Sequence, residues 1–271
     1  MRNVLAVFKK EMGSYLHSPI AYVLTLIFLI LTGYFFQSAM SMLSDYSSAY
    51  PAYMQQYEQM RGMGPPPPPP NVDVHVISRT YGTMIIILLF LVPMLTMRTY
   101  AEEQRMGTME LLMTSPITPM ETLLGKFFGA LGIFTGIVAL TLIYPILITV
   151  YADAGSRPDW GALFATYLGL FLFGAACLSI GIFASSLTEN QIIAAAMSFA
   201  LLLMLFVIGV SGQRQANFSF GQFLLYLSIT GHMDKFQRGV IAVKDLVYYI
   251  SMASFMLFVT NRVLEAKRWR Q

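Results

Sequence analysis

The side chains best suited to polar chemistry gather in one segment, residues 98–121. It contains Glu102, Glu103, Arg105, Gly107, Thr108 and Glu110. On a helix, Glu102 and Arg105 would stand close enough to pair. Carboxylates and a guanidinium in this pattern indicate a polar, charged segment outside the membrane, and we expect no catalytic residue among them.

The same segment carries an apolar pattern and clear boundaries. Its apolar residues Met106, Met109, Leu112 and Met113 can share one helical face, which Pro116 ends. Thr118, Pro119 and Glu121 then fit a capping box that starts a helix entering the membrane near Leu124. Periodicity alone fits a solvated hairpin as well as a docking element.

Other chemistry finds little support in the sequence. No Gly-x-x-x-x-Gly-Lys-Ser/Thr motif occurs, and the fragment from Gly125 to Phe127 lacks the upstream glycine and the hydroxyl residue that would bind Mg²⁺. His17, His75 and His232 show no metal-ligand spacing, so we interpret them as interfacial polar residues. Met54, Met60 and Met63 could offer thioethers to Cu(I), but flexible apolar filler is the commoner role of methionine. We therefore expect neither a metal nor a cofactor in this chain.

The elements that position these residues are membrane-spanning helices. The chain is 56% hydrophobic and 11% charged, with a mean hydropathy of +0.61, whereas a soluble domain is about 25% charged. A bilayer requires about 20 apolar residues per helix. Windows without formal charge predict six spans, at 20–40, 81–97, 124–151, 162–184, 191–210 and 246–262. The prediction is an all-α integral membrane protein.

The first seventeen residues form a different element. Leu5, Phe8, Met12 and Tyr15 recur at helical spacing, which predicts an amphipathic helix in the membrane interface. A frayed tail is the alternative. Ser18 can cap the next helix with Pro19 at its first position, which predicts an elbow. The following window is too long for a signal-peptide core and lacks a cleavage site, so we expect it to be retained.

Basic residues near the two ends predict the orientation. Arg2, Lys9 and Lys10 precede the first span, and Arg262, Lys267, Arg268 and Arg270 follow the last one, so the positive-inside rule favours both termini in the cytoplasm of a bacterial inner membrane. This parity requires six spans, so we interpret residues 215–243 as an outer re-entrant hairpin. Arg214, Lys235, Arg238 and Lys244 do not follow the rule.

The predicted exoplasmic loop, residues 41–79, has an unusual composition. Tyr46, Tyr50, Tyr53 and Tyr57 recur at helical spacing before a run of six prolines, Pro65 to Pro70. The run predicts a stiff polyproline II spacer. The tyrosines could bind a partner, but aromatic residues at an outer interface more often lie at headgroup level.

Two stretches resemble a known family. Residues 102–116 resemble the motif after the second span of ABC-2 type permeases, in which this region forms a coupling helix in a groove of the nucleotide-binding subunit. The residues His232, Phe236, Arg238, Gly239, Asp245, Tyr248, Tyr249 and Ser251 are similar to the end of gliding-motility GldF type permeases and of the NosY-like permease of nitrous oxide reductase maturation.

This resemblance implies a permease subunit of an ABC transporter. It implies six spans with a coupling helix and outer-leaflet re-entrant helices, two copies of a separate ATPase that binds ATP and Mg²⁺, and a second permease copy, identical or paralogous. An accessory GldG-like membrane protein with a periplasmic domain is a further expected partner, and nucleic acid is not. The alternative is a mechanical subunit that moves no solute. An independent carrier is less expected, because no acidic or basic residue lies deep in a predicted span.

Overall fold

The computed structural model describes residues 2–60, 65–109, 117–151, 157–214 and 219–268, and all regular elements in these ranges are helical. Six helical segments are long and apolar enough to cross a membrane: Pro19–Gln59, Asp73–Arg105, Pro119–Tyr151, Trp160–Leu187, Gln191–Gly212 and Val243–Arg268. The predicted all-α membrane fold with six spans is confirmed.

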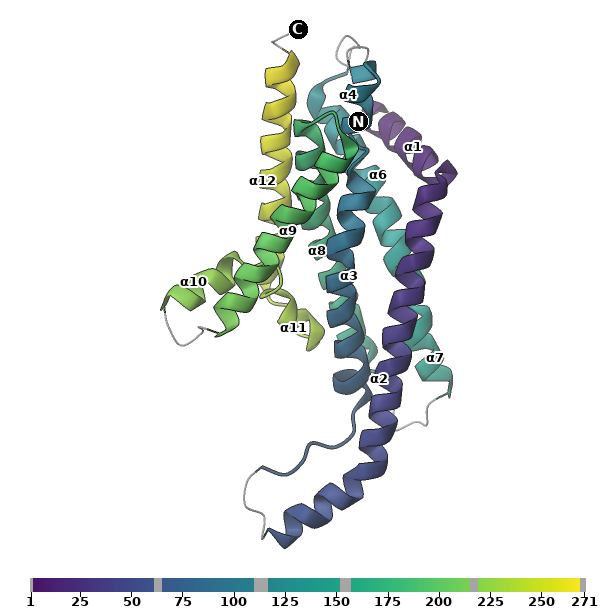
Figure 1. Ribbon diagram of the computed structural model, residues 1–271, viewed down its shortest axis with the longest axis vertical. Helices are drawn as coiled ribbons and strands as arrows, with labels where there is room; N and C mark the ends of the chain where they lie inside the picture. Colours follow the sequence, from purple (N-terminus) through teal and green to yellow (C-terminus); the bar gives the residue numbers. More distant parts are fainter. Residues whose placement is uncertain (1, 61–64, 110–116, 152–156, 215–218, 269–271) are drawn as a thin grey trace.

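The helices run alternately between two ends of an elongated bundle (Figure 1). The helices α1 (Arg2–His17) and α4 (Ala101–Arg105) lie at one end, together with the last turns of α12 (Val243–Arg268). We call this the α4 end. At the opposite end, α2 (Pro19–Gln59) continues beyond the bundle as an arm.

Helix α8 (Trp160–Leu187) is the centre of the bundle. It contacts α3 (Ser78–Thr96), α6 (Pro119–Leu140), α9 (Gln191–Arg214) and α12. Its most apolar stretch is 78% buried inside the protein, compared with 22% for α2 and α9. Because α8 is apolar on all faces, it suits this enclosed position. Helices α2 and α9 instead leave most of their apolar surface exposed on the outside of the bundle.

Helix α1 lies on α6 through a row of glycines. A Cβ atom on Gly125 would lie 2.6 Å from Cβ of Val7, and one on Gly129 would lie 2.7 Å from Cβ of Glu11. Small residues at such positions let two helices approach closely. The buried face of α1 therefore contains Val7 and Glu11, whereas Leu5 of the predicted apolar stripe is 53% exposed. The sequence pattern predicted the helix but not its packed face.

The elbow between α1 and α2 is present at Ser18. Ser18 has an extended backbone, with φ −83° and ψ 118°, and Pro19 occupies the first helical position. However, the Ser18 side chain makes no capping hydrogen bond. The predicted side-chain cap is therefore wrong, and the break depends on backbone geometry and on the proline.

Much of the predicted loop 41–79 is helical. Helix α2 continues to Gln59 with Pro51 inside it, and a short π-helix, η1 (Asp73–Ile77), precedes α3. The prolines 65–70 return along α2, where the Tyr46 hydroxyl donates to the Pro68 carbonyl at 2.6 Å and the Tyr46 ring stacks on His75. We call this contact the tyrosine–proline clasp. Tyr46 therefore binds another segment of the same chain.

Three short helices, α7, α10 and α11, connect the longer helices of the bundle. Helix α6 stops at Leu140 and resumes as α7 (Ile143–Tyr151), so the third predicted span is two helices. After α9, the short helices α10 (Ser219–Leu227) and α11 (Met233–Gln237) precede α12, and α11 packs on α8. These two helices occupy the predicted hairpin 215–243, of which residues 215–218 lie outside the described part.

Candidate coupling site

The helix α4 is fixed to the end of α8 by one serine. The Ser185 hydroxyl, which is fully buried, accepts hydrogen bonds from the backbone N–H groups of Tyr100 (3.0 Å) and Ala101 (3.1 Å). It donates to the Met97 carbonyl at 3.0 Å. The N-terminal N–H groups of a helix have no partner within the helix. Ser185 therefore supplies the missing acceptor and joins the end of α3 to α4.

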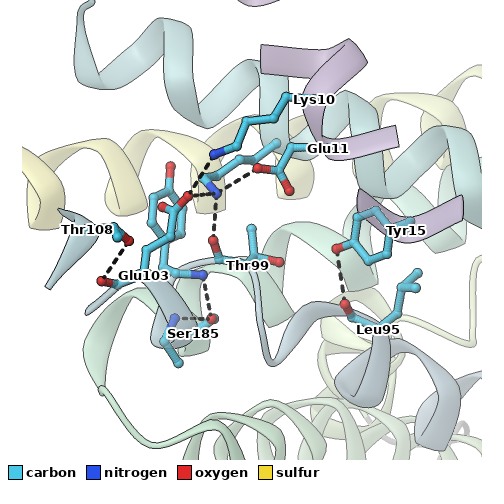
Figure 2. Close-up of polar contacts among 11 residues, drawn as sticks. Lys10, Glu11, Tyr15, Leu95, Thr99, Glu103, Thr108 and Ser185 are labelled. Atoms are coloured by element: carbon cyan, nitrogen blue, oxygen red, sulfur yellow. Dashed lines mark hydrogen bonds and ion pairs between the residues drawn. The ribbon is translucent and has the colours of Figure 1, made fainter. Parts of the chain in front are cut away.

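A buried lysine connects α4 with α1 and α6. Lys126 of α6 is 2% exposed, and its Nζ donates to the Glu11 carboxylate (3.0 Å), the Glu103 carboxylate (2.8 Å) and the Thr99 carbonyl (2.8 Å). Figure 2 shows Glu11, Thr99 and Glu103 converging in this cluster. All three ammonium hydrogens are thus used. We call Lys126, Glu11 and Glu103 the buried charge triad.

Two further contacts extend this network. Lys10 on α1 lies 3.6 Å from the Glu103 carboxylate, at a more exposed position. On the other side of α4, Gln104 donates to the Ser186 carbonyl at 3.2 Å, and the Lys267 ammonium of α12 reaches Gln104 Oε1 and the same carbonyl. Consequently α4 has polar contacts to α1, α6, α8 and α12.

The capping box that starts α6 also contacts α1. Thr118 and Glu121 exchange hydrogen bonds between side chain and backbone, which confirms the predicted capping box. The Asn3 amide donates to both Glu121 oxygens, at 3.2 and 3.3 Å. The N-termini of α1 and α6 are therefore held side by side.

The other predicted coupling residues face outward. Arg105, Met106, Gly107 and Thr108 are exposed, and Gly107 has φ +69°, which ends α4. Met106 is 61% exposed but Met109 is 6% exposed, so the predicted common face of these methionines is wrong. The left-handed glycine turns the chain between them. Glu110, Leu112 and Met113 lie outside the described residues.

The pairing within α4 also differs from the prediction. Glu102 and Arg105 form no ion pair, because the neighbouring Glu103 is the carboxylate that enters the triad. Sequence reasoning missed Lys126, Gln104 and Ser185. The signal for Lys126 was a lone lysine near the start of an apolar span. Such a residue needs acidic partners when it is buried.

The predicted outer motif forms a second cluster at the hairpin. His232 is 6% exposed and Asp245 is 1% exposed, and His232 Nδ1 lies 2.6 Å from Asp245 Oδ1. The other ring nitrogen lies 3.2 Å from the Tyr226 carbonyl, and the ring stacks on Tyr248 at 4.0 Å. Both ring nitrogens of His232 therefore face oxygen acceptors. His232 is buried in the hairpin and paired with Asp245, a contact that the sequence did not predict.

The remaining motif residues close the hairpin onto α8. The ring of Phe236 is buried against Gly169, and the Phe236 carbonyl accepts from the Thr166 hydroxyl at 3.0 Å. Gly239 has φ +77° and leaves only room for a hydrogen beside Ala162. Arg238 is exposed. The motif therefore anchors the chain that leads into α12.

A metal site is not found in the described residues, where no group of three or more His, Cys, Asp or Glu is placed to hold an ion. Met63, one of the three methionines considered for Cu(I), lies outside them.

The fold and this site define a multi-pass membrane protein with a polar connection between its helices at one end. A family model described as "ABC-2 family transporter protein" matches residues 5–264. The chain belongs to this family of ABC transporter membrane proteins. A comparison with curated proteins found no match to the chain.

Proposed function

We propose that the chain is the permease subunit of an ABC transporter and that a separate ATPase docks at the α4 end. One observation carries this proposal: α4 is joined by polar contacts to four other helices, α1, α6, α8 and α12. A displacement of α4 would therefore reach most of the bundle. Two ATPase copies and a second permease copy would complete the complex, with ATP and Mg²⁺ on the ATPases.

Exposure supports α4 as the docking element. Its inner side is occupied by Glu103 and Gln104, while Arg105, Met106 and Thr108 are exposed. Arginine and methionine are both enriched in the centres of protein interfaces. The family resemblance implies a coupling role for Glu102, Glu103, Arg105, Gly107, Thr108 and Glu110, of which Glu110 lies outside the described residues.

The distribution of basic residues supports a cytoplasmic α4 end. Lys9, Lys10, Arg105 and Lys267 all lie there, close to the ends of spans, where the positive-inside rule counts them. Both termini would then be cytoplasmic, and the arm would project outward from a bacterial inner membrane.

The test is co-purification with any ABC ATPase that is encoded beside this chain. Arg105→Glu combined with Met106→Ala should abolish retention of the ATPase and leave the permease in the membrane. Arg157→Glu is the matched control, because Arg157 is also exposed but precedes the start of α8, whereas α4 contacts Ser185 at the other end of α8. Unchanged retention by the double variant would contradict docking at α4.

A mechanical role without solute is a second candidate, and the arm favours it. Helix α2 has 41 residues, which is roughly 60 Å of helix, about twice the thickness of a hydrocarbon core. The tyrosine–proline clasp stiffens its outer part. Such an arm could pass motion to an accessory membrane protein with a periplasmic domain, of the GldG type.

These two candidates differ in one experiment. Replacing residues 44–70 by a short Gly/Ser linker should abolish capture of the accessory protein and leave ATPase retention unchanged if the arm is mechanical. If capture persists without the arm, the mechanical candidate loses its structural basis.

A further inference from the structure

A cavity beside the buried charge triad combines charged and apolar walls. It has a volume of about 380 Å³ and lies between α1, the start of α2, the end of α3 and α4. This volume falls in the range of ~300–1,000 Å³ that is typical of small-molecule sites. Its position at the α4 end, next to lipid-facing helices, makes it accessible to an amphipathic ligand.

One wall of the cavity is apolar and continuous with the membrane surface. Ile20 and Leu24 come from α2, and Met94 from α3. Ile20 is 36% exposed and Met94 is 47% exposed, so this wall is open on its outer side. An acyl chain lying along it would keep one side in the bilayer.

The polar wall presents one cation and one anion that lack an ionic partner among the described residues. Arg98 and Glu102 both line the cavity, and neither forms an ion pair with a described side chain. The Arg98 Nε is buried without a hydrogen-bond partner in the same part of the chain. Buried polar atoms are normally paired, so an unpaired guanidinium nitrogen beside a cavity points to an anionic partner.

The other charged groups of the cavity are already used. Lys126 is held by Glu11 and Glu103, and Lys10 lies beside Glu103. Burial raises the pKa of Tyr15 to about 12, so its hydroxyl adds no charge and donates to the Leu95 carbonyl. Among the described residues that line the cavity, the ligand therefore meets one positive and one negative group without an ionic partner, Arg98 and Glu102.

We propose that this cavity binds a phospholipid whose headgroup carries a primary ammonium, of the phosphatidylethanolamine type. Its phosphodiester accepts from the Arg98 guanidinium, and its ammonium faces Glu102. Its acyl chains lie against Leu24 and Met94. A guanidinium is well suited to a phosphate, and the balanced charges favour a zwitterion over an anionic lipid. Bound lipid would brace the elbow at Ser18 against α4.

Native mass spectrometry of the full chain in detergent tests this assignment. Phosphatidylethanolamine, phosphatidylglycerol and phosphatidylcholine with identical acyl chains are added separately, and we expect retention of the first to be strongest. Arg98→Gln should weaken retention about tenfold, the loss expected for one charge-assisted hydrogen bond. Glu102→Gln should reduce phosphatidylethanolamine to the level of phosphatidylcholine.

Controls separate the site from general lipid adhesion. Lys9→Gln removes an exposed charge outside the cavity and should change nothing. Met94→Trp blocks the apolar wall from an exposed position and should abolish retention even if Arg98→Gln fails to fold. Equal retention of all three lipids, or normal retention by Met94→Trp, would overturn the proposal. Competition by glycerophosphoethanolamine as effective as that by the lipid would assign a soluble phosphate ester instead and overturn the lipid.

Discussion

Gly129 and Glu11 meet where α1 crosses α6, and a Cβ atom on Gly129 would lie 2.7 Å from Cβ of Glu11. Real Cβ atoms do not approach so closely, so α1 can bring Glu11 to Lys126 only because position 129 has no side chain. The triad and the glycine row are therefore parts of one arrangement.

Gly129→Ala should displace α1 and lengthen the contact between Glu11 and Lys126. We expect a loss of about 1–3 kcal/mol, the usual effect of overpacking a close contact, measured by thermal unfolding in detergent. Gly136→Ala on the same helix is the control, because nothing lies within 4 Å of its added Cβ. Equal melting temperatures for the two variants would contradict this account.

Lys126→Met should be much more harmful than its exposed counterpart Lys9→Met. It leaves Glu11 and Glu103 buried without their cation, and breaking a buried pair typically costs about 3–5 kcal/mol. Adding Glu11→Gln and Glu103→Gln to Lys126→Met should recover a large part of that loss, because no buried charge then remains unpaired; Lys10, which loses Glu103, is exposed. Thermal unfolding measures both effects, and no recovery in the triple variant would argue against a triad.

Ser185→Ala should loosen α4 without changing the centre of α8. Three backbone groups lose their partner, at a cost of about 1–3 kcal/mol for buried groups left unpaired. Ser179→Ala, also on α8 and buried, removes only a bond to its own helix at Ala176. Faster hydrogen exchange at Tyr100 and Ala101 in the first variant alone is the expected result. The same exchange rates in both variants would refute it.

Asp245→Ala should release the hairpin that leads into α12. The change removes the acceptor of His232 Nδ1, and we expect a loss of about 1–3 kcal/mol, the cost of leaving a buried polar group unpaired. Asp45→Ala, at an exposed position, is the control. A cysteine introduced at Met233, which is 1% exposed, should become accessible only in the Asp245 variant. If both variants resemble the unmodified protein, the pair does not hold the hairpin.

Tyr46→Phe should open the tyrosine–proline clasp. It removes the hydroxyl that donates to the Pro68 carbonyl, worth about 0.5–1.5 kcal/mol. Tyr53→Phe is the matched control, since Tyr53 is 46% exposed and its hydroxyl makes no hydrogen bond with a described residue. Spin labels at Ser48 and Asn71 should show a broader distance distribution in the Tyr46 variant alone. Equal widths would contradict the clasp.

The sequence predicted the features that depend on local chemistry. Long charge-free windows predict the six spans, Pro19 predicts the elbow, and Thr118 with Glu121 predicts the start of α6, because each depends on residues close together in the chain. The family match over residues 5–264 agrees with this fold class.

The candidate site was less predictable because its partners are distant in the chain. Lys126 meets Glu11 and Glu103 only after α1 has packed on α6, and charge pairing between spans has no periodicity to detect. The same applies to Ser185 and to the clasp between Tyr46 and Pro68. Local pattern also favoured Glu102 over Glu103 as the paired carboxylate, whereas among the described residues it is Glu103 that forms ion pairs.

Since α2 is one continuous helix, a change of angle at the elbow at Ser18 would be transmitted along its whole length. Because α2 continues as one helix from Pro19 to Gln59, although it bends in its outer part (Figure 1), a tilt of about 10° at the elbow would move its far end by up to about 10 Å, the value for a straight helix of roughly 60 Å. Small rearrangements among α1, α4 and α6 would therefore produce a large displacement at the far end of the arm. A longer arm would give a larger displacement for the same tilt.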